Sequence, residues 1–183
     1  IGSVYNLGGA STTINMQNVG GGGEMPAGAS NIGIQLSDDH PIKYNVDTSK
    51  DTELQPPVSP VATYGAGAGG GTGTVECTSC HNAHDNQHTK FLVKSNDNAA
   101  ICTSCHVKTG WAGSSAHATS TVNYNSKQIQ TWGCVICHDS HTSGGTPYLL
   151  AGSEENTCYS CHDSTSGVGT NIQTSFGYSS VHP

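Results

Sequence analysis

The eight cysteines of this 183-residue chain all lie in four copies of one pentapeptide, Cys-x-x-Cys-His. This spacing is the attachment signature of c-type haem, in which two thiols bond the two vinyl groups on one porphyrin edge. The histidine that follows then lies under the iron as its proximal ligand. Four copies that use every cysteine predict four covalently bound haem c groups. The thioether cysteines are Cys77, Cys80, Cys102, Cys105, Cys134, Cys137, Cys158 and Cys161, and the proximal histidines are His81, His106, His138 and His162.

Two other uses of paired cysteines are open at this point. An even number of cysteines in an exported chain can form disulfides, and Cys-x-x-Cys pairs can hold structural zinc. A disulfide needs no histidine, and an all-cysteine zinc site excludes one. Because a histidine directly follows all four pairs, the pattern favours covalent haem.

Six further histidines are candidates for the second axial position of the irons. Since the chain has only two methionines, the sixth ligand must be histidine, water or nothing. An internal duplication supplies one extra histidine per motif, and His40 is a further candidate because Pro41 fixes the backbone beside it and nearby carboxylates could orient a ring nitrogen. His88 has no counterpart in the second repeat, and its role stays open. The distal candidates are His40, His84, His117, His141 and His182.

Two imidazoles on each iron would suit electron transfer rather than catalysis. Such an iron has no open position for substrate, and its surroundings change little between the ferric and ferrous states. A reductase would need an open iron with acid–base residues converging on it, and the sequence singles out none, so we expect no enzyme. Five candidates for four irons leave one histidine that is either structural or reaches the iron of a neighbouring copy.

The composition excludes several classes of protein. With six Lys and Arg residues and a formal charge of −7, the chain is a poor binder of nucleic acid. No apolar run approaches the roughly 18 residues that span a bilayer. The sequence starts at Ile1 without an apolar export segment, as an exported chain does after its signal peptide is removed. With 33% hydrophobic residues and 24 glycines, a core of side chains alone would be thin. Four porphyrins would supply the missing apolar faces.

The haem motifs are confined to the second part of the chain. Residues 1–64 hold no cysteine, and alternating apolar residues over 32–36 and 42–46 predict short half-buried strands in a haem-free arm or cap. The glycines at 20–23 and the glycine-rich stretch 65–73 are predicted to be flexible connectors.

Residues 74–183 contain two repeats, 74–127 and 128–183. The segment Cys77–His84 aligns with Cys134–His141, and Phe91-Leu-Val with Tyr148-Leu-Leu. Helical periodicity is weak, so we expect mostly coil with short helices around each motif and a few short strands. Only 20, 27 and 19 residues separate successive motifs, which keeps the haems close in a stacked chain.

Three stretches resemble the doubled-motif multihaem cytochromes c of metal-reducing, respiratory bacteria. These are the Cys-x-x-Cys-His-x-x-His motifs, Gly110-Trp-Ala-Gly-Ser-Ser-Ala-His117 and Asp39-His40-Pro-Ile42, and the likeness covers about residues 31–183. The resemblance implies an exported protein with closely stacked bis-histidine haems and little regular secondary structure. Relatives often carry another haem motif upstream of the Asp-His-Pro stretch, and this chain has none.

A four-haem chain with a glycine-rich, haem-free front is most similar to the extracellular tetrahaem cytochromes that polymerise into conductive filaments (nanowires). The similarity implies a subunit that binds itself head to tail and can lend a histidine to a haem in the next subunit, a use for the surplus histidine. It also implies electron exchange with other multihaem cytochromes or extracellular metal oxides in anaerobic respiration. The alternative is a soluble, monomeric periplasmic shuttle with the same ligands, although a simple shuttle needs no arm of 64 residues.

Overall fold

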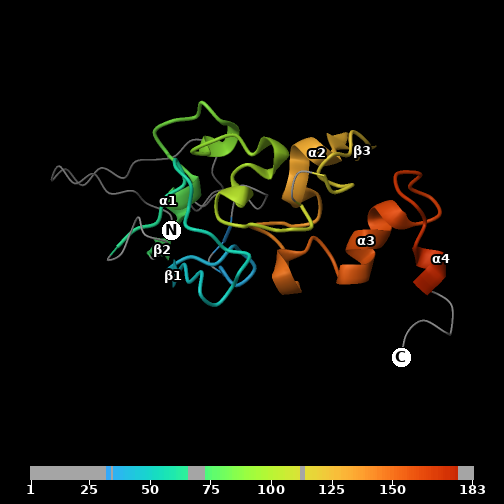
Figure 1. Cartoon of the computed structure of the whole chain (residues 1–183), viewed down its shortest axis with the longest axis horizontal. Coiled ribbons are helices and arrows are strands. Elements are labelled where there is room, and N and C mark those ends of the chain that lie inside the picture. Colours follow the sequence, from blue (N-terminus) through green and yellow to red (C-terminus); the bar gives the residue numbers. More distant parts are fainter. Residues whose placement is uncertain (1–31, 34, 66–72, 112–113, 177–183) are drawn as a thin grey trace, which may run out of the picture. The chain divides into compact units, whose positions relative to one another are not determined.

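The computed structural model describes residues 32–33, 35–65, 73–111 and 114–176 of the chain, which divides into two compact units, Ile1–Leu36 and Ser37–Pro183 (Figure 1). The second unit carries all four haem motifs, and each motif takes a number in chain order. Motif 1 is Cys77–His81, motif 2 Cys102–His106, motif 3 Cys134–His138 and motif 4 Cys158–His162.

Short elements joined by coil make up the second unit, as the sequence predicts. The strands are β1 (Tyr44–Asn45), β2 (Thr74–Val75), β3 (Asn123–Tyr124) and β4 (Lys127–Gln128). The α-helices are α1 (Cys77–Cys80), α2 (Ile129–Trp132), α3 (Glu154–His162) and α4 (Gln173–Phe176). The 3-10 turns are η1 (Thr89–Phe91), η2 (Asp97–Ala99), η3 (Cys102–Ser104), η4 (Gly133–Ile136) and η5 (Pro147–Leu149).

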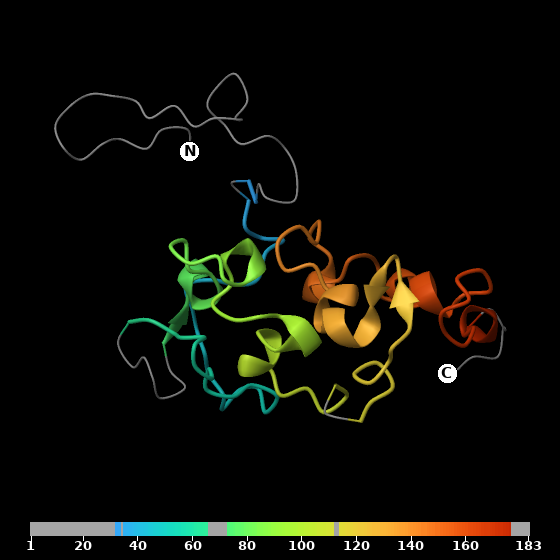
Figure 2. The ribbon, with the colours of Figure 1, turned by 90° about the horizontal axis from the view of Figure 1, so that it is seen from above.

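The described part of this unit contains two antiparallel strand pairs. β1 pairs with β2 through Tyr44 and Val75. β3 and β4 form a hairpin whose two turn residues, Asn125 and Ser126, have φ of 48° and 63°, the left-handed pair that a type I′ turn requires. The hairpin leads directly into α2 (Figure 2).

The segment of residues 37–64 is part of this unit, although the sequence groups it with the haem-free arm. The backbone N–H of Val107 donates to the Glu53 carbonyl at 2.7 Å, and that of Gln55 donates to the Cys105 carbonyl at 2.8 Å. The Lys108 ammonium also pairs with the Glu53 carboxylate at 2.6 Å. The segment is therefore held to motif 2 by long-range backbone bonds, which no local sequence pattern encodes.

The two alternating runs predicted as strands differ in outcome. In the second run, Tyr44 and Asn45 form β1. The described residues of the first run have no strand, and Ile32 and Leu36 are about two-fifths exposed, at 40% and 43%. The glycines at 20–23 and residues 66–72 of the predicted linker lie outside the described residues.

The side-chain core of the described residues is thin, as the composition predicts. The buried apolar residues are Val46, Val61, Ala99 and Ile129. η2 packs against α2 and η4, and there a Cβ added to Gly133 would lie 2.6 Å from the Cβ of Ala99. Since real Cβ atoms do not approach so closely, only glycine fits where the second repeat meets η2 of the first.

Candidate haem-binding sites

All four motifs lie on helical turns. Motif 1 begins on α1, motif 2 on η3 and motif 3 on η4, whereas motif 4 closes α3. In motifs 1 and 2 the serine before the second cysteine is only 2% exposed and fixes the turn. Ser79 Oγ accepts the Glu76 N–H at 3.0 Å, and Ser104 Oγ donates to the Ala100 carbonyl at 2.9 Å. The turns hold both thiols of each motif in positions set by backbone hydrogen bonds.

Three of the four proximal histidines have one ring nitrogen committed to the backbone. The Nδ1 atoms of His81, His138 and His162 lie 2.9, 2.9 and 2.8 Å from carbonyl oxygens of Lys90, Tyr148 and Thr170, respectively. A carbonyl only accepts, so Nδ1 must carry the proton and donate. The lone pair then lies on Nε2, which is the arrangement of a metal-ligating imidazole with a fixed second contact.

A turn with two left-handed residues presents the carbonyl to His81 and to His138. Lys90 and Phe91 have φ of 61° and 57°, and Tyr148 and Leu149 have φ of 59° and 57°. The structure therefore aligns Lys90 with Tyr148, one residue away from the sequence alignment of Phe91 with Tyr148. The second repeat has one extra residue before this turn, which sequence similarity alone does not reveal.

The carbonyl that holds His162 is placed by a close glycine contact. A Cβ added to Gly169 would lie 2.5 Å from both Cε1 and Nδ1 of His162. The Gly169 N–H donates to the Cys161 carbonyl at 3.0 Å, so the loop is also tied to motif 4. The absence of a side chain at residue 169 lets the backbone lie directly against the imidazole.

Asx turns follow motifs 1, 3 and 4. The Asn82, Asp139 and Asp163 side chains accept the backbone N–H two residues further on, at 3.1, 3.0 and 2.9 Å. After motifs 1 and 3 those N–H groups belong to His84 and His141, the second histidines of Cys-x-x-Cys-His-x-x-His. Hydrogen bonds from Thr142 and His141 lower the pKa of the Asp139 carboxyl in spite of its partial burial.

Three proximal rings face candidate distal rings from distant parts of the chain. The ring centroids of His81 and His141 are 5.9 Å apart, those of His106 and His40 6.2 Å, and those of His162 and His117 6.0 Å. A ligating nitrogen lies about 2.0 Å from its metal and about 1.1 Å from its own ring centroid, so two rings on opposite sides of one iron have centroids roughly 6 Å apart. All three pairs fit an iron between two imidazoles.

The remaining candidate histidines have no such partner in the described residues. No ring is recorded opposite His138, the proximal histidine of motif 3, or opposite His84 and His88. His182 lies outside the described residues. The structure thus brings together six of the nine predicted iron ligands.

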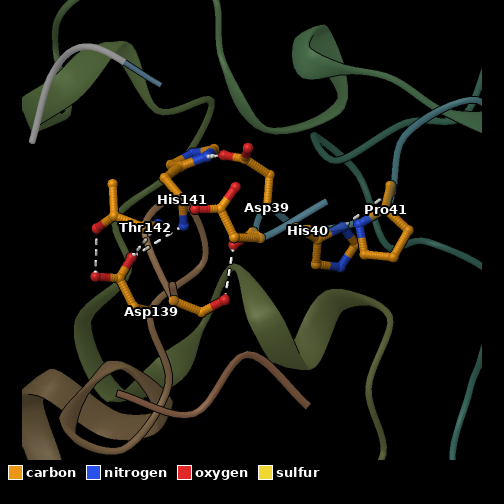
Figure 3. A network of polar contacts seen from close by, with 8 residues as sticks. Asp39, His40, Pro41, Asp139, His141 and Thr142 are labelled. Carbon is orange, nitrogen blue, oxygen red and sulfur yellow. Dashed lines mark hydrogen bonds and ion pairs between the residues drawn. The ribbon is translucent and has the colours of Figure 1, made fainter. Parts of the chain in front are cut away.

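The neighbouring residues Asp39 and His40 have different polar partners, His141 and Pro41 (Figure 3). His40 faces His106, and its Nδ1 lies 3.1 Å from the Pro41 carbonyl. The neighbouring Asp39 points to His141 instead, with 3.1 Å between its Oδ1 and the histidine Nδ1. The sequence suggested that a carboxylate orients the His40 ring, and this was wrong for Asp39, which serves a ring 102 residues away.

Burial favours the neutral form of the His106 ring of motif 2. Burial lowers the pKa of His106, and the nearby His40 ring makes a smaller contribution in the same direction. A lower pKa favours neutral imidazole, the form that can ligate iron.

Thiols of successive motifs lie close enough to affect one another. The interaction between the Cys102 and Cys134 thiols raises the pKa of Cys102 and lowers the pKa of Cys134 to about 7. Burial raises the pKa of Cys80, with a smaller effect of Cys105, and burial and Cys161 do the same for Cys137. These effects connect motif 1 with motif 2, motif 2 with motif 3 and motif 3 with motif 4.

A cavity of about 360 Å³ lies at motif 3. It is lined by His138, by Tyr148 and Leu150 of the following turn, and by Thr157 and Cys158 of α3. Tyr148 as a whole residue is 85% exposed. A hollow beside a proximal histidine, with large apolar side chains on its wall, suits an apolar porphyrin face.

The described residues contain no cluster of three or more His, Cys, Asp or Glu side chains able to hold a metal ion.

Comparisons with known proteins point to the same chemistry. The family model of the doubled CXXCH motif matches residues 71–110 and 127–167. Multiheme cytochrome MtrA of Shewanella baltica (strain OS185) is 32% identical over 91 residues, which are 48% of this chain and 24% of that relative. The chain thus spans about a quarter of the relative's length. No solved structure matches.

The doubled motifs indicate covalently bound c-type haem. The similarity over 91 residues is likewise to a multihaem cytochrome. No helix among the described residues has the length and apolar character to cross a membrane.

Two features of the sites were absent from the sequence predictions. The Nδ1 acceptors Lys90, Tyr148 and Thr170 act through backbone carbonyls, for which the sequence carries no signal. Gly169 could have been suspected, because a glycine seven residues after a proximal histidine stands in otherwise polar coil.

Proposed function

We propose that this protein transfers electrons through four covalently bound c-type haems, each held between two histidines, and that it is not an enzyme. The three imidazole pairs at the spacing of bis-histidine iron carry the proposal. Bound haem supplies reversible one-electron chemistry at its iron. The protein's own part is to hold each ring rigidly and to leave no axial position open to substrate.

The order of the motifs supports a closely spaced chain of haems. Thiols of motifs 1 and 2, of 2 and 3, and of 3 and 4 lie near one another. Two thioethers tether each porphyrin by one edge, so adjacent attachment points keep adjacent porphyrins close. Ligands from distant parts of the chain fix their separation, because each pair joins segments that could otherwise move apart.

The relation between the two repeats favours a polymer. Motif 1 pairs His81 with His141, which follows the first motif of the second repeat. If the repeats were related by a closed two-fold axis, His84 would face His138 in the same way. Both residues are described, and no such ring contact is recorded. Among the described residues the two repeats are therefore not related by a two-fold axis, and a head-to-tail arrangement of copies is compatible with this.

Continuing this relation from copy to copy would supply a second histidine to motif 3. His84 of a neighbouring copy would face His138, just as His141 faces His81. The subunit then binds itself head to tail in an extracellular or cell-surface filament and exchanges electrons with other multihaem cytochromes or metal oxides. It needs no nucleic acid and no membrane span. The alternative, a periplasmic monomeric shuttle, would complete the motif 3 site with its own His182 or leave it with one histidine.

Negative-stain electron microscopy of native material, run beside size-exclusion chromatography monitored at the haem absorbance, tests the filament. Uniform filaments that contain all the haem support it, and a monodisperse species of one chain with four haems establishes the shuttle. The variants His84→Ala and His182→Ala then separate the two sources of the ligand. Only His84→Ala should abolish filaments, whereas loss of one low-spin haem in monomeric His182→Ala protein would overturn the assignment.

A further inference from the structure

The carboxylate of Asp39 differs from every other recorded acceptor of a ligand ring. Among the described residues, the Nδ1 atoms of His40, His81, His138 and His162 all face backbone carbonyls. Only His141 faces a carboxylate, that of Asp39, at 3.1 Å. The Asp39 residue is 7% exposed, and its Oδ2 is fully buried with no hydrogen-bond partner among the described residues.

Such a contact changes the ligand electronically as well as positioning it. A hydrogen bond from a ligating imidazole to a carboxylate makes the ring a stronger donor to its metal than a bond to a neutral carbonyl does. The charge itself, screened little because it is buried, favours the ferric over the ferrous iron. Both effects lower the reduction potential of the iron that His141 shares with His81.

We propose that Asp39 is a positioning residue that holds His141 and lowers the reduction potential of the haem at motif 1, setting it apart from the other three haems. The inference deepens the proposed function and rests on its His81–His141 pair. The haem at one end of the chain of motifs would then differ in potential from the rest, because a single buried charge lies next to its distal ligand.

The loop that carries Asp39 is fixed independently of the carboxylate. The His40 N–H donates to the Ser140 carbonyl at 2.9 Å, and the Ser143 hydroxyl donates to the Asp38 carbonyl at 2.9 Å. Changing the carboxylate to an amide therefore leaves the loop and the His40 ligand in place. An asparagine oxygen still accepts from His141 Nδ1, so the substitution removes the charge and keeps the shape.

The test compares Asp39→Asn, Asp39→Glu and Asp139→Asn as filaments or monomers with all haems loaded. Asp139 is a matched control, because its carboxylate binds the backbone N–H of the same His141, at 3.0 Å, and not the ring. Redox titration followed by absorbance gives the four couples, and electron paramagnetic resonance of the ferric protein reports the ligands of each iron.

In Asp39→Asn, the reduction potential of one of the four haems should rise by about 59 mV, which is a tenfold change in the one-electron equilibrium between its ferric and ferrous forms. All four low-spin signals should be retained. Asp39→Glu should reverse most of this rise. Asp139→Asn should change the ferric/ferrous equilibrium of no haem by more than threefold. No couple moving by more than threefold in Asp39→Asn, or all four moving together, would overturn the inference.

Two further outcomes separate this inference from the proposed function. If His141→Ala leaves the motif 1 iron low-spin with two nitrogen ligands, the ligand pairing itself is wrong. If Asp39→Asn loads fewer than four haems, titration of the wild-type protein decides, with haem resonances assigned by nuclear magnetic resonance. The haem at motif 1 must then have the lowest potential, and any other haem in that place refutes the role of Asp39.

Discussion

Replacing Gly169 by alanine should damage one haem site and leave the other three intact. The new Cβ would lie 2.5 Å from Cε1 and Nδ1 of His162, whereas ordinary contacts begin at 3.4 Å. The ring or the loop must therefore move by about 0.9 Å, several times the roughly 0.2 Å that a metal–ligand distance tolerates. Whichever moves, the bond from His162 Nδ1 to the Thr170 carbonyl, 2.8 Å long, is strained or broken.

Overpacking of this kind costs roughly 1–3 kcal/mol, which lowers the Tm of a domain of this size by about 2–12 °C. Circular dichroism of the haem-loaded protein measures this change, and electron paramagnetic resonance should show one of the four ferric haems with altered or high-spin signals. Gly152→Ala is the control, since its Cβ would meet Thr157 at an ordinary 3.5 Å. A Gly169→Ala protein with unchanged Tm and four unaltered low-spin signals would refute the role assigned to this contact.

Three further substitutions test other parts of the structure. Gly133→Ala places a Cβ 2.6 Å from the Cβ of Ala99, at a φ of 57°, and should lower the Tm by several degrees, in contrast to Gly110→Ala, which meets nothing within 4 Å. His117→Ala should leave only the motif 4 iron with a single histidine, visible as one high-spin haem. Glu53→Gln should lower the Tm slightly at neutral pH, because the hydrogen bond from Lys108 lowers the pKa of this exposed carboxyl. This contribution to stability is fully present well above the usual pKa of a glutamate, about 4.3, and is lost as pH falls below it. The difference in Tm should therefore begin to shrink near pH 4 and vanish only below the lowered pKa of the folded state.

Candidate thioether and proximal residues can be recognised from sequence because each motif is local. Two cysteines and one histidine within five residues define one attachment, and a short helical turn is enough to present them. The mostly coiled fold could also be predicted, since weak periodicity and many glycines leave little else. These features depend on neighbouring residues alone.

The pairing of distal ligands could not be predicted in this way. The paired rings are separated by 60 residues for His81 and His141, by 66 for His40 and His106, and by 45 for His117 and His162. Each pair depends on how distant loops pack, such as the backbone bonds that hold residues 53–58 against motif 2. For the same reason the contact of Asp39 could not be predicted from sequence. Its neighbour His40 lies against His106 of motif 2, whereas the Asp39 carboxylate contacts His141, whose ring lies against His81 of motif 1.

The histidines proposed as ligands also join separate parts of the fold, which would help so thin a core to suffice. The Nδ1–carbonyl bonds of His81, His138 and His162 close loops of 9, 10 and 8 residues, and the His141–Asp39 bond joins segments 102 residues apart. An imidazole fixed on Nε2 by iron donates from Nδ1 in one direction only, so ligation selects these bonds over the alternatives that a free ring could make. Few buried apolar side chains would otherwise oppose the entropy of the glycine-rich coil. We therefore expect haem attachment and folding to be coupled in this chain, as metal binding and folding are in other small metal-dependent domains.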